Sequence, residues 1–375
     1  MAVRPIVHGP RPISAWPRPI SAWQLFLHER KLFASRTDSS HIMGRARRQI
    51  HSGQVYEICM RTRQGLPFVC TNYMKMLIEG IMARVQRDHK VILCHHLWMG
   101  NHPHMIVVAK DKKACTCFYG EVQKQLTEAV KRLLGLKHLT LWKNNCTSVI
   151  PYYDLETVCF RIAYLYANPA SANLVDSISQ YPGVSTWRGF RDSTGSLEDT
   201  IVKQCPWVRA PMIEKLSRPA VSRDEDLRIC RAWKKDATES HELIFYPNAW
   251  MKSFGLVKKE EFEEAIETIH RFHLALEEEA RKRRKRRAMG KAKLRSQPLD
   301  LSYYPKKPSR RIFVYSLDPA LRAYLIEAYR NFCDRCRECY ECWKLGDFSV
   351  KWPSGALYPP VPNLVNEFPP QLEFV

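Results

Sequence analysis

Two hydrophobic patterns alternate along residues 55–190, and together they predict a compact unit of mixed helices and strands. Apolar residues that recur every three or four positions predict amphipathic helices, and short continuous apolar runs predict buried strands. The predicted helices span residues 72–86, 118–134 and 155–168, and the predicted strands lie within residues 55–60, 90–98, 105–109 and 137–150.

The ends of these helices carry residues with clear conformational preferences. Thr71 or Asn72 is a good N-cap for the first helix, and Gly135 predicts a left-handed C-cap for the second. Pro169 predicts the end of the third. Further along, the pattern predicts helices over residues 256–280 and from Asp318 to about residue 345, so residues 191–375 are expected to be mainly helical.

The first 42 residues have a different composition. They contain the tandem repeat Arg-Pro-Ile-Ser-Ala-Trp, at residues 11–16 and 18–23, within a proline-rich context. Proline disfavours regular structure, so residues 1–42 are expected to form a poorly ordered arm. The repeat is either a recognition peptide or a simple duplication.

Composition narrows the class of partner. The 375 residues carry a formal net charge of +21, with a pI near 9.5, which favours an anionic partner such as nucleic acid. The longest apolar runs have the length of strands, so no membrane span is expected. The odd number of cysteines, 13, and the absence of a secretory leader predict reduced thiols and a cytoplasmic protein, associated with the nucleoid if the source is bacterial.

Four of the cysteines are regularly spaced within the last predicted helix. Cys333, Cys336, Cys339 and Cys342 are each separated by two residues, a spacing that invites an iron–sulfur or zinc interpretation. Steps of three residues on a helix spread the side chains along a ridge instead of folding them around an ion. Packing of buried cysteines is the alternative.

The candidate chemistry lies in two segments about sixty residues apart. His102 and His104 are one residue apart in a predicted strand and therefore project to the same face, where they can bind one ion. Tyr164 and Asn168 are four residues apart and share one face of the predicted helix 155–168, whereas Tyr166 lies on another. Each residue also has an ordinary structural interpretation, as a strand-end histidine, a core aromatic or part of a helix stop.

Taken together, these segments resemble the single-tyrosine HUH transposases, specifically the REP-associated tyrosine transposase branch. The resemblance rests on the histidine pair, on Tyr164 to Pro169 followed by Asn173 to Val175, and on the flanking segments 43–58 and 181–185. It covers roughly residues 43–190. The resemblance implies a ferredoxin-like or RRM-like HUH nuclease core, an antiparallel sheet with flanking helices, so the whole chain is expected to be α+β with a mainly helical extension over residues 191–375.

The resemblance also implies an activity. Tyr164 would be the nucleophile that cleaves and rejoins single-stranded DNA through a 5'-phosphotyrosine intermediate. His102, His104 and Asn168 would hold a divalent metal, Mg²⁺ or Mn²⁺. The family's target is single-stranded DNA, often near a hairpin, and its members act as dimers.

Several positions depart from the family pattern. Pro103 stands between the histidines, where an aliphatic residue is usual, and favours an edge strand or a bulge. Gly100 stands where proline is frequent, and Asn173 where glycine is frequent. Residues 142–147 lack the glycine and arginine usual there. These departures are either lineage variation or the mark of a copy that binds DNA without cutting it.

Basic residues are the expected contacts to phosphate. Residues 281–295 form a strongly basic segment, which either binds phosphates or is a solvated linker. Trp98 and Trp142 either stack on unpaired bases or fill the core. The alternative to catalysis is a basic protein that binds RNA or DNA. The predicted DNA-binding residues are Arg45, Arg47, Arg48, Arg61, Arg63, Arg283, Arg284, Arg286 and Arg287.

Overall fold

A four-stranded antiparallel sheet forms the centre of the molecule. The computed structural model describes residues 47–144, 147–212, 222–304 and 312–362. The strand order is β2-β3-β1-β4, and every neighbouring pair is antiparallel. The strands are β1 (Val55–Cys59), β2 (Ile92–Met99), β3 (His102–Val108) and β4 (Ser148–Pro151).

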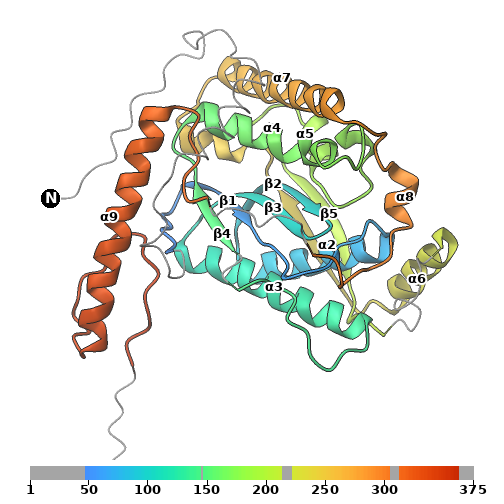
Figure 1. Ribbon diagram of the computed structural model, residues 1–375, viewed down its shortest axis with the longest axis horizontal. Helices are drawn as coiled ribbons and strands as arrows, with labels where there is room; N and C mark the ends of the chain where they lie inside the picture. Colours follow the sequence, from blue (N-terminus) through green and yellow to red (C-terminus); the bar gives the residue numbers. More distant parts are fainter. Residues whose placement is uncertain (1–46, 145–146, 213–221, 305–311, 363–375) are drawn as a thin grey trace, which may run out of the picture.

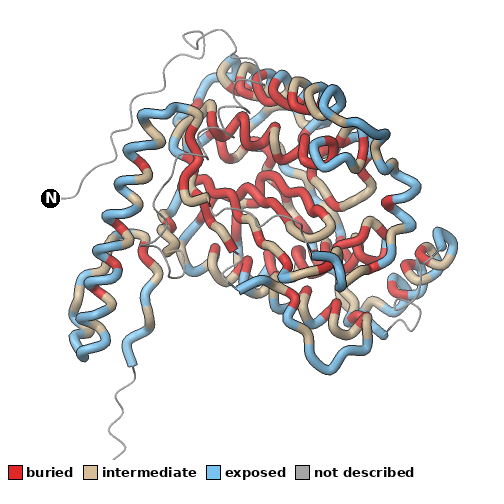
Figure 2. Tube along the Cα trace, viewed as in Figure 1, coloured by how far each residue is buried: buried red, intermediate tan, exposed pale blue. Residues whose placement is uncertain are grey.

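Helices cover both faces of this sheet (Figure 1). On one face, Tyr56 and Ile58 of β1 pack into a core with α2 (Asn72–Asp88) and α3 (Lys112–Leu133). On the other face, Val55 of β1 packs into a second core with α4 (Leu155–Ser171) and α7 (Lys259–Arg283). Figure 2 shows the sheet buried between these two layers. Alternation of side chains along β1 thus assigns odd-numbered residues to the α4 face.

Side-chain caps fix where the main helices begin. Thr71, Asp111 and Asp154 accept backbone N–H groups at the starts of α2, α3 and α4. Gly135, which follows α3, has a φ of 64° and gives the chain the left-handed turn expected there. The α+β architecture expected from the sequence is confirmed.

The rest of the chain is mostly helical and packs on this core. The strands β5 (Ile201–Trp207) and β6 (Glu239–Phe245) form a separate two-stranded antiparallel sheet against α2. The helix α7 packs on α4, so residues on the two sides of the predicted boundary at residue 190 are in contact. The domain boundaries stay a prediction. The remaining elements are η3 (Ile178–Gln180), α5 (Trp187–Arg191), α6 (Arg223–Asp236), η5 (Ala249–Phe254), α8 (Lys291–Arg295) and α9 (Pro319–Lys344).

Two expectations about proline were wrong. Pro169 does not stop the helix: α4 continues to Ser171, because a proline in the last turn removes only one hydrogen bond near the helix end. The chain turns instead after Ala172, where Asn173 adopts a φ of 61°. Pro103 does not lie on an edge strand, since β3 runs between β2 and β1.

The long helix α9 lies at one side of the molecule (Figure 1). Of its four regularly spaced cysteines, Cys336 and Cys339 are buried, Cys333 is half-buried and Cys342 is exposed. Cys336 packs in a small cluster with Phe332 and Ala356. No helix among the described residues is long and apolar enough to cross a membrane.

Candidate functional site

The two histidines of β3 lie side by side on the α4 face of the sheet. Their ring centroids are 5.0 Å apart, His104 is buried and His102 is half-buried. His104 pairs in register with Cys59 of β1, which places its side chain on the same face as Glu57, two residues along. The strand geometry therefore brings a carboxylate to the histidine pair.

Glu57 is the centre of a buried hydrogen-bond network. Its Oε1 lies 2.6 Å from Nδ1 of His104, and its Oε2 accepts the Tyr152 hydroxyl at 2.6 Å. The guanidinium of Arg161, on α4, donates to both oxygens at 3.0 to 3.1 Å. Burial raises the pKa of Glu57, but Arg161 and then His104 outweigh burial and lower this pKa to about 2. The carboxylate is therefore ionised at neutral pH.

This carboxylate fixes the tautomer of His104. An ionised carboxylate only accepts hydrogen bonds, so Nδ1 of His104 carries the proton and Nε2 keeps its lone pair. His102 has the same arrangement, since its Nδ1 lies 2.6 Å from the side-chain oxygen of Asn101. Burial holds the pKa of His102 well below 6.5, and repulsion from His104 in its protonated form and from Arg61 lowers this pKa further. Both imidazoles thus offer an Nε2 lone pair.

The tyrosine of the predicted helix lies over the same face of the sheet. The guanidinium carbon of Arg161 is 4.4 Å from the centroid of the Tyr164 ring and 4.0 Å from that of Tyr315. Arg161 also donates to the Tyr315 hydroxyl at 3.2 Å. Because Arg161 binds Glu57, and Glu57 binds His104, the three predicted residues His102, His104 and Tyr164 belong to one neighbourhood.

Asn168 follows Tyr164 by one helical turn. It is 9% exposed, and its side-chain nitrogen is buried without a hydrogen-bond partner among the described residues. Tyr166, in contrast, is fully buried, and its hydroxyl contacts Nδ1 of His95 at 2.8 Å and the Thr186 hydroxyl at 2.9 Å. Burial raises the pKa of Tyr166, which makes it a poor nucleophile.

The structure brings together two of the three predicted metal ligands, the imidazoles of His102 and His104. Within the described ranges, no group of three or more His, Cys, Asp and Glu side chains is arranged to hold a metal. Asn168 as a third ligand, and Mg²⁺ or Mn²⁺ as the ion, stay predictions.

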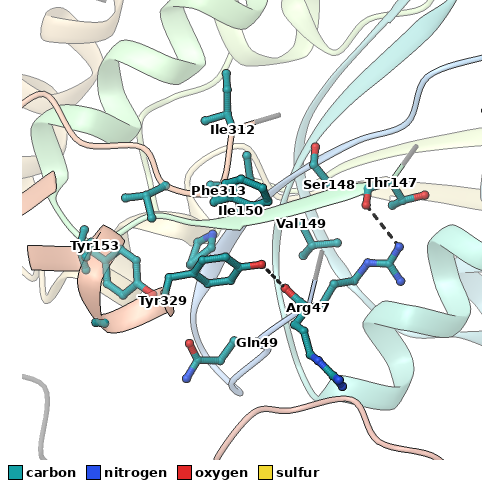
Figure 3. Close-up of a pocket in the computed structure, with 15 residues that line it drawn as sticks. Arg47, Gln49, Thr147, Ser148, Val149, Ile150, Tyr153, Ile312, Phe313 and Tyr329 are labelled. Carbon is teal, nitrogen blue, oxygen red and sulfur yellow. Dashed lines mark hydrogen bonds between the residues drawn. The ribbon is translucent and has the colours of Figure 1, made fainter. Parts of the chain in front are cut away.

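The predicted DNA-binding arginines have diverse environments. Arg47 and Arg48 border a groove beside the free edge of β4 (Figure 3), where Arg48 donates to the Tyr119 hydroxyl at 2.9 Å. Arg61 lies close enough to His102 to affect its pKa. Arg63 is exposed, and Arg45 lies outside the described residues.

In the basic run of residues 281–287, two of the predicted arginines have acidic partners. Arg283 pairs with Glu279 at 2.5 Å, and Arg284 pairs with Asp176 at 2.5 Å. Arg286 and Arg287 are exposed. Arg286 and Arg287 therefore remain the better candidates for contact with phosphate.

Both tryptophans considered as stacking platforms contribute to packing. Trp98 is 1% exposed and meets Phe68 edge-on, with ring centroids 5.2 Å apart. Trp142 is half-buried, and its ring nitrogen donates to the Gln123 carbonyl at 2.9 Å. Trp98 thus offers no ring face to a base.

Sequence reasoning missed Glu57, Arg161 and Tyr315 as members of this site. Glu57 is the one carboxylate in the otherwise apolar or aromatic strand Val55–Cys59, and Arg161 is the one cation within the buried part of α4. A charge in a buried element needs a partner. That rule would have singled out Glu57 and Arg161, although not their contact with each other.

Comparison with known proteins gives one distant structural match. The sequence matches no protein-family model and no curated protein. A solved structure described as the REP-associated tyrosine transposase bound to a REP hairpin is similar over 40% of this chain and 87% of that chain, with 21% identity and a TM-score of 0.35. Similarity at this level does not establish a family for the chain.

Proposed function

We propose that this protein cleaves and rejoins single-stranded DNA, with Tyr164 as nucleophile and a divalent ion held by His102 and His104. The observation that carries the proposal is the position of Arg161. Its guanidinium contacts the Tyr164 ring and also binds Glu57, which orients His104. These contacts support a site in which the proposed nucleophile and the proposed metal ligands share one face of the sheet.

The protein's own residues prepare the two imidazoles. Glu57 and the side chain of Asn101 each hold an Nδ1–H, so both Nε2 atoms are available as ligands. Asn168 would contribute its side-chain oxygen. A bound Mg²⁺ or Mn²⁺ would supply Lewis-acid polarisation of the scissile phosphate.

The phenol provides the covalent step. The Tyr164 oxygen forms a bond to phosphorus while the bond from phosphorus to the 3' oxygen breaks, and the phenolic proton leaves to solvent or to the departing 3' oxygen. The product is a 5'-phosphotyrosine and a free 3' hydroxyl. Attack by a 3' hydroxyl on this linkage reverses the step and releases Tyr164, so rejoining needs no external energy source.

The charge of the chain supports a polyanionic substrate. A net charge of +21 and the exposed Arg63, Arg286 and Arg287 favour a phosphate backbone. A single strand, with or without an adjacent hairpin, suits this site better than a duplex, because a half-buried phenol reaches a phosphodiester more easily when the strand is unpaired. The proposed ligands and nucleophile all come from one chain, and a homodimer remains a further proposal.

An adduct assay tests this function. A labelled oligonucleotide is incubated with the protein and Mn²⁺, and a denaturation-resistant protein–DNA adduct is expected. Tyr164→Phe should abolish the adduct, while Tyr324→Phe, at an exposed position on α9, should not. Salt-sensitive binding without any adduct would reject catalysis and favour a nucleic-acid-binding protein.

A further inference from the structure

Four cations gather where α2, α5, α8 and β5 meet, away from the residues of the candidate site. Figure 1 shows α8 at one side of the molecule, between α5 and the end of α2. Arg295 ends the basic segment 281–295, for which phosphate binding was one interpretation, whereas the other three cations were not singled out by the sequence patterns. They are Lys75 on α2, Arg188 on α5, Lys203 on β5 and Arg295 on α8.

Direct contacts connect three of these elements. Lys203 pairs with Glu79 at 2.5 Å, and Glu79 lies one helical turn after Lys75 on the same side of α2. The helix α5 packs closely on β5, since the Ile201 side chain fills the space that a Cβ at Gly189 would take. Arg188 is therefore next to the strand that carries Lys203.

The position of Arg295 follows from two neighbours. Its charge acts on the amine of Lys75 and on the thiol of Cys70, which lies just before α2. Leu294, the preceding residue, is buried in the core on the α4 face of the sheet, while Arg295 itself is exposed. A buried leucine thus anchors the helix that carries Arg295.

The cluster carries more positive charge than the protein neutralises. Two acidic groups act on the four cations: Glu79 pairs with Lys203 and raises the pKa of Lys75, and Asp192 lies within the electrostatic influence of Arg188. In the part of the chain that the structure describes, no ion pair joins Lys75, Arg188 or Arg295 to an acidic side chain. Lys75 is half-buried, and burial, followed by repulsion from Lys203, Arg188 and Arg295, lowers its pKa despite Glu79. Such an arrangement is unfavourable unless an anion binds to it.

The cluster lies at the same end of the sheet as the histidine pair. Cys70, which is beside Lys75 and Arg295, also neighbours Tyr181, whose hydroxyl donates to the Trp98 carbonyl at 2.7 Å. Trp98 lies near the end of β2, and His102 begins β3 after a short turn. The chain of contacts from Cys70 through Tyr181 thus reaches the β2–β3 turn that precedes His102.

We propose that Lys75, Arg188 and Arg295 form a phosphate-binding site for the backbone of a single-stranded nucleic acid, with Lys203 as a fourth cation. The choice of ligand rests on the proposed function, but binding is measured without catalysis. Free inorganic phosphate has the same chemistry and is the competing ligand. Four separate elements supply the four cations, so the site exists only in the folded protein.

The test is the salt dependence of binding to fluorescein-labelled oligothymidine, with divalent ions removed by chelation. For Lys75→Gln/Arg188→Gln/Arg295→Gln, the slope of log K against log salt should decrease in magnitude by about 2, since each lost contact to a single strand contributes roughly 0.7. The control Arg330→Gln/Arg335→Gln/Lys351→Gln removes three exposed charges near α9. The control should retain the slope of the unmodified chain.

Several results would overturn this assignment. Equal slopes for the cluster variant and the unmodified chain would do so, as would an equal decrease in the α9 control, which would indicate only a general charge effect. A thermal shift by inorganic phosphate that the cluster variant loses, without a change in the DNA slope, would assign the site to the free anion and contradict the proposal. The adduct assay tests cleavage, and the salt slope tests phosphate binding by the cluster. A negative adduct assay therefore leaves the result of the slope measurement unchanged, and each proposal can fail without the other.

Folding of the cluster variant is checked in the same experiment. Removing three mutually repelling cations should leave the melting temperature unchanged or raise it. A lower melting temperature together with an unchanged slope would show a structural role and reject phosphate binding.

Discussion

Oε1 of Glu57 and Nδ1 of His104 lie 2.6 Å apart across neighbouring strands of the central sheet. This contact holds one tautomer of His104 and directs its Nε2 lone pair away from the carboxylate. It exists because β1 and β3 pair in a register that places Cys59 opposite His104 and leaves Glu57 on the same face. An orienting carboxylate of this kind raises the basicity of a metal-binding histidine.

Glu57→Gln should weaken metal binding. The amide keeps the shape of the carboxylate but loses its charge, so His104 is no longer held in one tautomer, and Mn²⁺ affinity should fall about 10- to 100-fold. Isothermal titration with Mn²⁺ measures this loss, with Glu278→Gln at an exposed position as the control. Unchanged affinity would show that Glu57 does not orient a metal ligand.

The same substitution should also destabilise the fold. Arg161 is 5% exposed, and the substitution removes the charge of the carboxylate with which it forms a buried ion pair. Removing one member of a buried ion pair costs about 3 to 5 kcal/mol. Urea unfolding measures the loss, and Glu57→Gln/Arg161→Met should recover part of it if the broken ion pair is the cause.

Tyr315 should stabilise the folded protein through its contacts with Arg161, although it lies far along the chain from the other residues of the candidate site. Tyr315→Phe removes the hydroxyl that accepts from Arg161 at 3.2 Å but keeps the ring over the guanidinium, so it should cost about 1 kcal/mol. Tyr315→Leu also removes the ring and should cost more. A comparison of the two by urea unfolding separates the hydroxyl from the ring. Equal stability of both variants and the unmodified chain would contradict this role.

Stability should fall as pH decreases below about 6.5 because two histidines are buried in neutral form. Burial lowers the pKa of His95 and of His96 to about 3, whereas unfolded histidine has a pKa of 6.5. Between these values the unfolded state binds more protons, so acid favours unfolding by about 1.4 kcal/mol per pH unit for each histidine.

His96 provides the sharper test of this pH dependence, because neither of its ring nitrogens has a hydrogen-bond partner among the described residues. His96→Leu should reduce the slope of unfolding free energy against pH by about 1.4 kcal/mol per unit. His138→Gln, at an exposed position, should leave the slope unchanged. An unaltered slope in His96→Leu would contradict the assignment of a neutral buried imidazole.

Asp226 should stabilise the start of α2 from another helix. Its carboxylate accepts the backbone N–H of Asn72 at 2.8 Å and that of Tyr73 at 3.0 Å, in addition to the Asn72 side chain. Asp226→Ala removes these acceptors from a helix N-terminus and should cost about 1 to 3 kcal/mol. Urea unfolding measures the loss. The control is Asp224→Ala, at a nearby exposed position, and it should cost much less stability.

Local patterns were sufficient to predict most of the core elements. The helices α2 and α4 and the strands β1 to β3 appear in the sequence as periodic apolar positions with recognisable caps, because helix and strand formation depend on neighbouring residues. The shared face of His102 and His104 follows from strand geometry alone. The position of Pro103 in an inner strand does not, because strand order is set by contacts between distant segments.

By itself the sequence determined that the chain forms an α+β core with a mostly helical extension, and it placed two histidines on one strand and Tyr164 on one helix. Only the tertiary structure decided that Glu57, Arg161 and Tyr315 connect them, and that Arg188 and Arg295 lie within the electrostatic influence of Lys75. The contact of Arg161 with Tyr315, for example, joins residues 154 positions apart. Such contacts depend on strand register and helix packing, which no local pattern encodes.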